Sequence, residues 1–306
     1  MTFIAFFCIL VMLINATERV YMKKSFSMRN VLALALLLCP FAFVQAKTII
    51  WDLSGVIFKV DKVGLSYYEL GWKEFGKYML WDHKNPMSIK NMIFNDLLYR
   101  LKQAYPVGEV PAYMPEGNLM PPIMADWLRG KISGEEIIKQ LLALTKDLHE
   151  RHYFASEREH AMIEKTIQVI FDPQIFSAYF KPHKSALALV VECSDYGHDN
   201  AILSNLDTDS YECLKRTRHG SKAFRLFNQN RIFISGYHGF IKPDIQAFKR
   251  AIELYGLNPA ECFFVDDQIE NIQAAASLGI QGYWLKNNDY KGLRRALVEA
   301  GYLPAE

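Results

Sequence analysis

Apolar residues recur along the chain in two rhythms, which predicts two kinds of structure. From residue 184 onward, short apolar runs typical of strands alternate with amphipathic stretches of about 10–15 residues typical of helices. This alternation indicates βαβ units around a parallel sheet. The predicted strands are 201–203, 231–235, 262–265 and 281–285, and the predicted helices are 184–195, 208–217, 243–255 and 268–278.

The first strand of this sheet is predicted far upstream. Residues 47–51 form a short apolar run that ends in Asp52, and Gly55 and the apolar segment 56–58 follow. A buried strand, a tight turn and a second apolar segment explain this order.

Between these parts, from about residue 64 to residue 180, the pattern is helical, with long amphipathic stretches at 87–104, 133–147 and 157–171. Ser133 and Glu136 are spaced as a capping box, so we expect a helix to begin just after Ser133. The predicted fold class is therefore α/β, with a parallel-sheet core that is split by a helical insertion. The predicted core comprises residues 47–60 and 182–306, and the predicted insertion comprises residues 61–181.

Residues 1–46 resemble an export segment. A basic stretch at 23–29 precedes an apolar run at 31–44, and Val44-Gln45-Ala46 offers the small residues of a cleavage site, as in a secretory signal peptide. We expect cleavage after Ala46 and a periplasmic or secreted protein, with only transient membrane contact. An uncleaved membrane anchor is the alternative. A start codon at Met22 or Met28 would explain the second apolar stretch further upstream.

Charge and cysteine content narrow the choice of partners. The chain has 35 Lys and Arg residues and 33 Asp and Glu residues, so no large basic field indicates nucleic acid. Removal of the export segment would leave 31 basic and 32 acidic residues, because four basic residues and one acidic residue lie in it. Three cysteines would remain, which is no disulfide framework. An oxidising compartment would still allow a Cys193–Cys213 bridge.

Polar groups suited to phosphate chemistry follow four of the predicted strands. Ligands of an open parallel sheet bind beyond the carboxyl ends of its strands. The groups expected there are Asp52, Ser204 with Asn205, Lys242 and the pair Asp266-Asp267. Each has an ordinary structural explanation when taken alone, as a turn former, a helix cap or a solvated lysine. Their joint order favours a functional site.

This set of groups fits phosphoryl transfer. A carboxylate can attack phosphorus and divide hydrolysis into two steps. Because a phosphate dianion repels that carboxylate, a hard cation such as Mg²⁺ is needed, and aspartate oxygens are suitable ligands for it. A lysine and a serine can stabilise charge on the phosphoryl oxygens.

At these residues the chain resembles the haloacid dehalogenase (HAD) superfamily of hydrolases. The four motifs are TIIWDLSGVIF (48–58), AILSN (201–205), IKPDIQAFKRAI (241–252) and FFVDDQIENIQAAASLGI (263–280). The segment RGKISGEEI (129–137) is similar to a cap-helix signature of the branch with glucose-1-phosphate phosphatase and the amino-terminal phosphatase domain of soluble epoxide hydrolases. The resemblance covers about residues 47–286. It implies a Rossmann-like core, with the helical insertion at 61–181 as an inserted helical cap domain.

The resemblance implies a role for each residue. It implies Asp52 as the nucleophile, Lys242 as the catalytic cation, and Ser204, Asn205 and Lys242 as phosphate ligands. It implies Mg²⁺ held by Asp52, the main-chain carbonyl of Ser54 and Asp267, with Asp266 behind them or as an additional ligand, and Asn271 as an outer partner. The implied activity is hydrolysis of a small phosphorylated metabolite.

Ser54 departs from the family pattern. Most phosphatases of the family have a second Asp at this position as general acid and base, and a serine cannot donate a proton as a carboxylic acid does. The related branch includes phosphatases with Gly there, so activity is not excluded. Asp61 is the hypothetical replacement. The alternatives are a dehalogenase, a phosphotransferase and a catalytically weak binding module with the same fold.

Overall fold

A five-stranded parallel sheet forms the centre of the computed structural model, which describes residues 47–80 and 86–305. The strand order is β5-β4-β1-β6-β7, and every neighbouring pair is parallel. The predicted α/β fold with a parallel sheet is therefore confirmed. The strands are β1 (Thr48–Trp51), β4 (Asp199–Ser204), β5 (Ile232–Ile234), β6 (Cys262–Asp266) and β7 (Gln281–Trp284).

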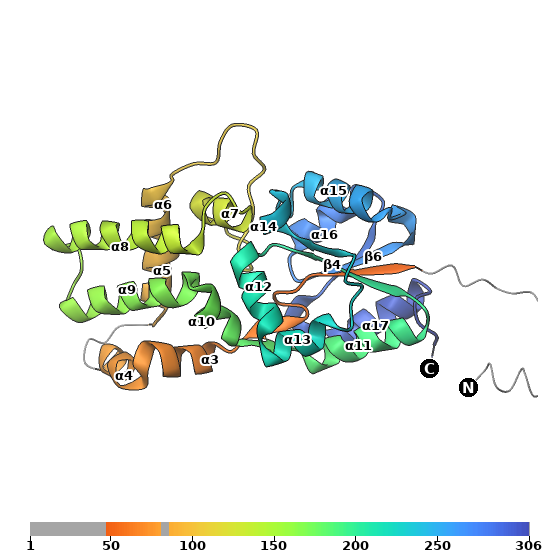
Figure 1. Ribbon diagram of the computed structural model, residues 1–306, viewed down its shortest axis with the longest axis horizontal. Coiled ribbons are helices and arrows are strands. Elements are labelled where there is room, and N and C mark those ends of the chain that lie inside the picture. Colours follow the sequence, from red (N-terminus) through yellow and green to blue (C-terminus); the bar gives the residue numbers. More distant parts are fainter. Residues whose placement is uncertain (1–46, 81–85, 306) are drawn as a thin grey trace, which may run out of the picture. The chain divides into compact units, whose positions relative to one another are not determined.

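Helices cover both faces of this sheet, which explains why its central strands β1 and β6 are buried at every position. Figure 1 shows α15 (Ile245–Tyr255) and α16 (Ile269–Ala276) on one side of the sheet and α11 (Lys184–Asp195) and α17 (Tyr290–Glu299) on the other. Ile50 of β1 packs in the apolar core that includes side chains of α15 and α16, while Ile49 and Trp51 pack in the core that includes side chains of α11 and α17. The buried indole of Trp51 donates to Asn200 Oδ1 over 2.8 Å, which satisfies its one polar atom.

The helices around the sheet follow the predicted order, and the structure has three more helices than were predicted for this part of the chain. Predicted helices end within three residues of the observed ones, whereas α13, α14 and α17 were not predicted. These helices are α11 (Lys184–Asp195), α12 (Thr208–Arg216), α13 (Arg218–Phe224), α14 (Ser235–His238), α15 (Ile245–Tyr255), α16 (Ile269–Ala276) and α17 (Tyr290–Glu299), with short 3-10 turns η3 (Pro259–Glu261) and η4 (Lys286–Asn288).

Along the chain, a second group of helices is inserted between β2 (Phe58–Val60) and β3 (Phe180–Pro182), and these two strands pair antiparallel with each other. These helices have an apolar core of their own. Ser133 Oγ accepts a hydrogen bond from Glu136 N over 3.1 Å, so the predicted start of helix α8 just after Ser133 is confirmed. The helices are α3 (Lys62–Leu65), α4 (Trp72–Leu80), α5 (Pro86–Met92), α6 (Leu98–Leu101), α7 (Pro122–Leu128), α8 (Gly134–Glu150), α9 (Glu157–Phe171) and α10 (Pro173–Ala178), with wider π-helical turns η1 (Ser66–Gly71) and η2 (Ile93–Leu97).

The helix predicted over 87–104 is one place where the structure differs from expectation. It begins as α5, widens into the π-helical turn η2 and ends with α6 at Leu101. Lys102 is already extended (φ −150°, ψ 113°), so the last residues of the predicted helix belong to a loop.

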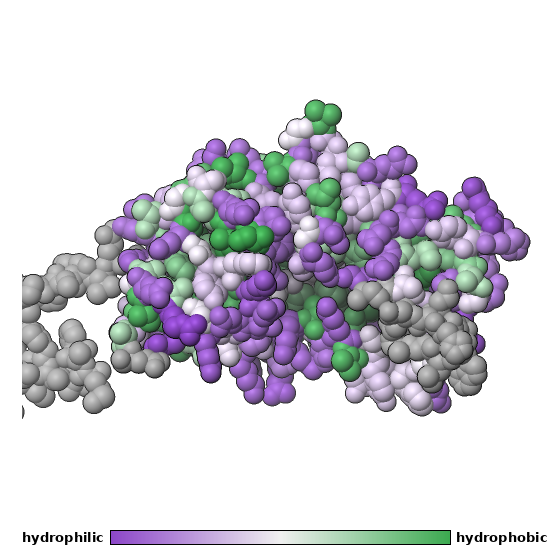
Figure 2. Space-filling view, turned by 180° about the vertical axis from the view of Figure 1, so that it is seen from behind, coloured by the Kyte–Doolittle hydropathy of each residue, from purple (hydrophilic) through white to green (hydrophobic). Residues whose placement is uncertain are grey.

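Several expectations concern the export segment and the cysteines. Residues 1–46 lie outside the described residues, so the signal peptide and the cleavage site stay predictions. Within the described part of the chain, none of the helices has the length and apolar character needed to span a membrane. Cys193, Cys213 and Cys262 are all free thiols, so the structure has no Cys193–Cys213 bridge. On the face shown in Figure 2, hydrophilic side chains cover most of the surface and hydrophobic ones form small patches.

Candidate active site

Three neighbouring strands bring their terminal polar residues to the same edge of the sheet. Asp52 follows β1, Ser204 ends β4 and Asp266 ends β6, and these three strands are adjacent and parallel. The Asp52 N–H donates to Val265 O over 3.0 Å, so the ladder between β1 and β6 continues into the site. All three polar side chains are buried. The Ser204 hydroxyl is close enough to the Asp52 carboxylate to favour its charged form, which acts to lower the pKa of Asp52.

Lys242 joins the carboxylates of this edge. Its Nζ donates to Asp52 Oδ1 over 2.7 Å and to Asp266 Oδ2 over 2.6 Å, and only 2% of its side chain is exposed. The ammonium also lies 5.3 Å from the ring centroid of Phe264. A buried lysine with two aspartate partners forms the strong, charge-assisted hydrogen bonds expected of a rigid site.

Asn205 holds Lys242 in place. Its Oδ1 accepts from Lys242 N over 2.8 Å, and its Nδ2 donates to Lys242 O over 2.9 Å. Both ends of the amide are therefore occupied by the main chain of Lys242. These contacts give the Asn205 side chain the role of positioning Lys242, and the predicted role of Asn205 as a phosphate ligand stays a prediction.

The adjacent carboxylates Asp266 and Asp267 have different surroundings. Asp266 Oδ1 accepts from Gln268 N over 2.8 Å and from Asn271 Nδ2 over 2.9 Å, while Oδ2 faces Lys242. Its oxygens are thus engaged by protein donors. The Asn271 contact agrees with the expectation of an outer partner.

Asp267 instead lies against the turn after β1. A Cβ added at Gly55 would stand only 2.1 Å from Asp267 Oδ2, and Gly55 has a φ of +82°. Glycine is therefore required at this position, both for the backbone conformation and for the close approach of the carboxylate. The turn also includes a 2.8 Å hydrogen bond from Gly55 N to Phe58 O.

Burial and mutual repulsion shift the pKa values of these groups. Burial raises the pKa of Asp52 to about 6, although the Lys242 ammonium opposes this shift. Burial raises the pKa of Asp267 to about 7, with further contributions from the charges of Asp52 and Asp266. For Lys242, burial acts to lower the pKa, but the charges of Asp266 and Asp52 outweigh it and the pKa is raised.

The donor set fits a hard divalent cation. Asp52, Asp266 and Asp267 each offer a carboxylate oxygen, and these oxygens lie within 4.8 Å of one another. With all groups ionised, the three carboxylates and Lys242 carry a net charge of −2 in a buried position. A single Mg²⁺ would balance that charge, and it prefers oxygen ligands of this kind.

Ser54 and Asp61, the remaining predicted site residues, have other surroundings. Ser54 is exposed, and its main chain forms a bridge with Phe58. Asp61 caps α3 by accepting from Gly64 N over 3.1 Å and forms an ion pair with Lys181. The pKa of Asp61 is lowered, because the hydrogen bond from Lys181 and, to a lesser extent, the one from Gly64 N stabilise its charged form. A lowered pKa is the opposite of what a general acid near neutral pH needs.

Ser235 is a structural residue of this edge that sequence reasoning missed. It is fully buried, donates to Leu128 O of α7 over 2.6 Å and accepts from Leu206 N over 2.9 Å. Gly130 also lies against this region, because a Cβ there would stand 2.4 Å from Gly236 O. The sequence did hold a signal for Ser235, because it is the last residue of the predicted strand 231–235 and should therefore lie at the edge of the sheet.

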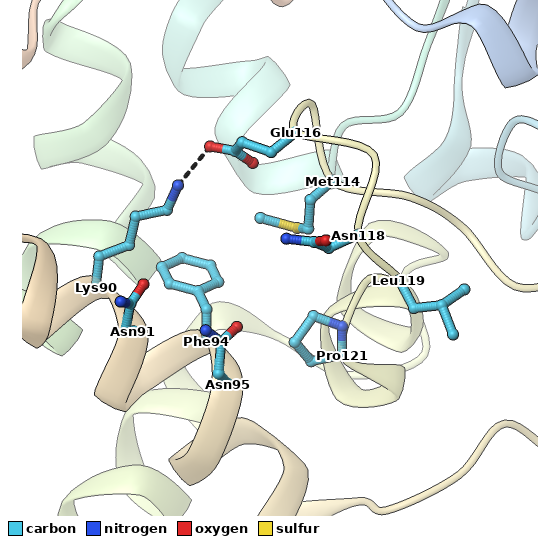
Figure 3. Close-up of a pocket in the computed structure, with 9 residues that line it drawn as sticks. All are labelled: Lys90, Asn91, Phe94, Asn95, Met114, Glu116, Asn118, Leu119 and Pro121. Carbon is cyan, nitrogen blue, oxygen red and sulfur yellow. Dashed lines mark hydrogen bonds and ion pairs between the residues drawn. The ribbon is translucent and has the colours of Figure 1, made fainter.

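A small cavity lies apart from these residues, within the helical group. Figure 3 shows it between α5, η2 and the loop that precedes α7, with the Phe94 ring facing the loop. Its volume is about 240 Å³, below the range of about 300–1,000 Å³ typical of ligand pockets. Lys90 is paired with Glu116 Oε1 at 2.5 Å, so this cation is already engaged. The lining residues are Lys90, Asn91, Phe94, Asn95, Met114, Glu116, Asn118, Leu119 and Pro121.

Comparisons with known proteins give the family. A model of the haloacid dehalogenase-like hydrolases matches residues 46–279. A sesquiterpene phosphatase from Aspergillus oryzae is 25% identical over 108 residues, which are 35% of this chain and 53% of that protein. The match therefore spans about half the length of that relative.

Two further enzymes are among the solved structures that match this chain. A HAD family enzyme from Bacteroides thetaiotaomicron is 18% identical, with a TM-score of 0.49 over 82% of this chain and 98% of that chain. The L-2-haloacid dehalogenase from Xanthobacter autotrophicus is 18% identical, with a TM-score of 0.45 over 85% of each chain. Because the family model matches well over half of its residues, this chain belongs to the haloacid dehalogenase-like hydrolases.

Proposed function

We propose that this HAD-like hydrolase is a Mg²⁺-dependent phosphatase that cleaves a small phosphate monoester through an aspartyl-phosphate intermediate on Asp52. The observation that carries the proposal is the buried contact of Asp52 with Lys242, beside the carboxylates Asp266 and Asp267. The phosphatase among the relatives supports the same reaction class.

The first step is displacement at phosphorus. An Asp52 carboxylate oxygen forms a bond to phosphorus, the bond from phosphorus to the substrate oxygen breaks, and that oxygen takes up a proton from a water molecule. Lys242, which donates to Asp52, and the Ser204 hydroxyl at the same edge would stabilise charge on the phosphoryl oxygens. In the second step, water displaces Asp52 from phosphorus and releases inorganic phosphate.

The metal has a defined place in this proposal. Asp52, Asp267 and the main-chain carbonyl of Ser54 would hold Mg²⁺, with Asp266 as a further oxygen nearby. When bound, the ion supplies positive charge that lets a carboxylate approach a phosphate dianion. Asp266 is engaged by Lys242, a main-chain N–H and Asn271, so its main contribution would be to hold Lys242 and balance its charge.

We further propose the domain roles and the location of the protein. Residues 61–181 would act as a cap that contacts the leaving group of a small phosphorylated metabolite, such as a sugar phosphate. Cleavage after Ala46 would release the protein to the periplasm or the medium, and it would leave Asp52 near the new amino terminus. A mass measurement of the exported protein tests the cleavage point, and an intact chain in the membrane fraction would contradict it.

One assay tests the activity. The purified protein is offered a panel of phosphate monoesters and 2-haloacids, with Mg²⁺ and with EDTA. We expect phosphate release that EDTA abolishes and that Asp52→Asn lowers by at least about 10²-fold. The matched control Asp195→Asn, at an exposed carboxylate, should keep full activity. Metal-independent halide release, or silence on every substrate by a folded protein, would contradict the proposal.

A further inference from the structure

Two aromatic side chains near the end of the chain donate hydrogen bonds to the main chain of the candidate metal site. Trp284 ends β7, and its Nε1 donates to Asp267 O over 3.0 Å. Tyr290 begins α17, and its Oη donates to Val56 O over 2.6 Å. We propose that Trp284 and Tyr290 are positioning residues that hold the Asp267 carboxylate and the turn after β1 in the geometry that binds Mg²⁺. The inference rests on the metal site of the proposed function.

The Tyr290 hydroxyl holds the turn that contains Ser54. Val56 is fully buried, and a buried carbonyl without a hydrogen-bond donor is costly, so this contact stabilises the turn. Within the turn, Gly55 N donates to Phe58 O over 2.8 Å. The main-chain carbonyl of Ser54, the proposed Mg²⁺ ligand, therefore belongs to a segment that is fixed from inside and from α17.

The Trp284 indole holds the main chain of the carboxylate that faces this turn. Strand β7 pairs with β6 so that Trp284 lies beside Asp266, and Leu285 N donates to Asp266 O over 2.8 Å. The indole extends this pairing to the next carbonyl, that of Asp267. Because the bond holds the peptide unit after Asp267, it opposes main-chain rotations that would turn the carboxylate away from Gly55.

Both donors are themselves held in place. The Tyr290 ring packs against the His183 imidazole with the ring centroids 4.3 Å apart, and Tyr290 is buried. Lys286 Nζ lies 4.9 Å from the centroid of the Trp284 ring. Burial, with a smaller contribution from the charge of Asp267, raises the pKa of Tyr290, so its hydroxyl keeps its proton and stays a donor near neutral pH.

Mg²⁺ makes strict demands on the groups that bind it. The ion requires ligand distances of about 2.0–2.1 Å in near-ideal octahedral geometry, so a small movement of one ligand weakens binding. Residues that hold metal ligands from behind typically change metal affinity by about 10–100-fold when they are replaced. Loss of either hydrogen bond should therefore weaken Mg²⁺ binding, although no ligand oxygen is removed.

The test is a Mg²⁺ titration of the full chain by calorimetry, with Trp284→Phe and Tyr290→Phe. Each substitution keeps an aromatic ring and removes one hydrogen-bond donor. We expect the dissociation constant for Mg²⁺ to rise about tenfold in each variant. The matched control is Tyr105→Phe in the helical group, because Tyr105 Oη also donates to a main-chain carbonyl, Met120 O, over 2.8 Å. This control should bind Mg²⁺ like the wild type.

Urea denaturation without Mg²⁺ separates positioning from general stability. Loss of a hydroxyl should lower the free energy of unfolding in both Tyr290→Phe and Tyr105→Phe, but only Tyr290→Phe should bind Mg²⁺ less tightly. Equal weakening of Mg²⁺ binding in these two variants would overturn the role of Tyr290. Trp284 is 39% exposed, so Trp284→Phe provides a folded variant should Tyr290→Phe unfold.

Asp267→Asn distinguishes a failure of this inference from a failure of the proposed function. Suppose that the wild type binds Mg²⁺ and that Asp267→Asn binds it much less tightly. Wild-type affinity in both Trp284→Phe and Tyr290→Phe would then overturn the positioning roles and leave the phosphatase proposal standing. Equal Mg²⁺ binding by the wild type and Asp267→Asn would instead contradict the metal site, and the positioning roles would be overturned with it.

Discussion

Gly55→Ala is a small change that should disable the proposed metal site through one contact. The added Cβ would stand 2.1 Å from Asp267 Oδ2 and 2.6 Å from Asp267 Cγ, far inside van der Waals distance. The carboxylate must then move away. The backbone is also strained, because the φ of +82° at Gly55 suits glycine and disfavours alanine.

The magnitude follows from these distances. Ordinary contact begins at 3.4 Å, so the carboxylate has to retreat by more than 1 Å. Mg²⁺ demands ligand distances of about 2.0–2.1 Å in near-ideal geometry, so a displacement of that size removes Asp267 as a ligand. We expect the dissociation constant for Mg²⁺ to rise at least about tenfold, equivalent to about 1.4 kcal/mol. Backbone strain should cost about 1–2 kcal/mol of stability in addition.

Gly197→Ala separates the two effects. Gly197 has nearly the same φ, +81°, but a Cβ there would meet nothing within 4 Å. Urea denaturation should show a similar loss of stability in both variants, whereas Mg²⁺ titration should show weakened binding only for Gly55→Ala. Wild-type Mg²⁺ affinity in Gly55→Ala, or equal weakening in both variants, would refute the reasoning.

Three further predictions concern charged groups. Lys242→Met leaves Asp52 and Asp266 without their cation, so urea denaturation at about pH 8 should show a free energy of unfolding lowered by about 3–5 kcal/mol. This loss should shrink at about pH 5 as the carboxylates protonate, and equal losses at both pH values would contradict the reasoning. Asp61→Asn should keep kcat within about threefold because Asp61 caps α3, and a kcat drop of about 10²-fold or more would restore its role as the acid. Mg²⁺ should raise the melting temperature more at about pH 8 than at about pH 5. The folded pKa values of Asp52 and Asp267, about 6 and about 7, exceed the ordinary 3.8, so the stability that these carboxyls contribute when protonated is lost as the pH rises through those values. The ion then offsets the charges of the ionised carboxylates, and equal shifts of the melting temperature at both pH values would count against the site.

The sheet was predictable because each strand is a short apolar run with a turn residue at its end. The strand predicted at 262–265 differs from β6 by one residue, and the others lie within three residues of those observed. Contacts between distant segments were not predictable in the same way. β2 and β3 pair across more than a hundred residues, and neither strand has more than three residues. The helix α17 did carry a signal, since Tyr290, Leu293 and Leu297 are buried at helical spacing.

The sequence was sufficient to predict which residues of the site lie close together. The carboxyl ends of parallel strands meet at one edge, so Asp52, Ser204 and Asp266 could be placed together from their positions alone. Their individual contacts depend on side-chain directions that sequence spacing does not specify. For this reason the engagement of Asn205 with the main chain of Lys242 emerged only from the structure.

The claim that Asp52 attacks phosphorus is tested most directly by trapping the intermediate. The protein is quenched with acid during turnover of a phosphate monoester that it hydrolyses, digested and mapped by mass spectrometry. We predict one phosphoryl group on the peptide that contains Asp52, present in Asp195→Asn and absent in Asp52→Asn. A phosphoryl group on any other residue, or undiminished turnover in Asp52→Asn, would contradict the assignment of the nucleophile.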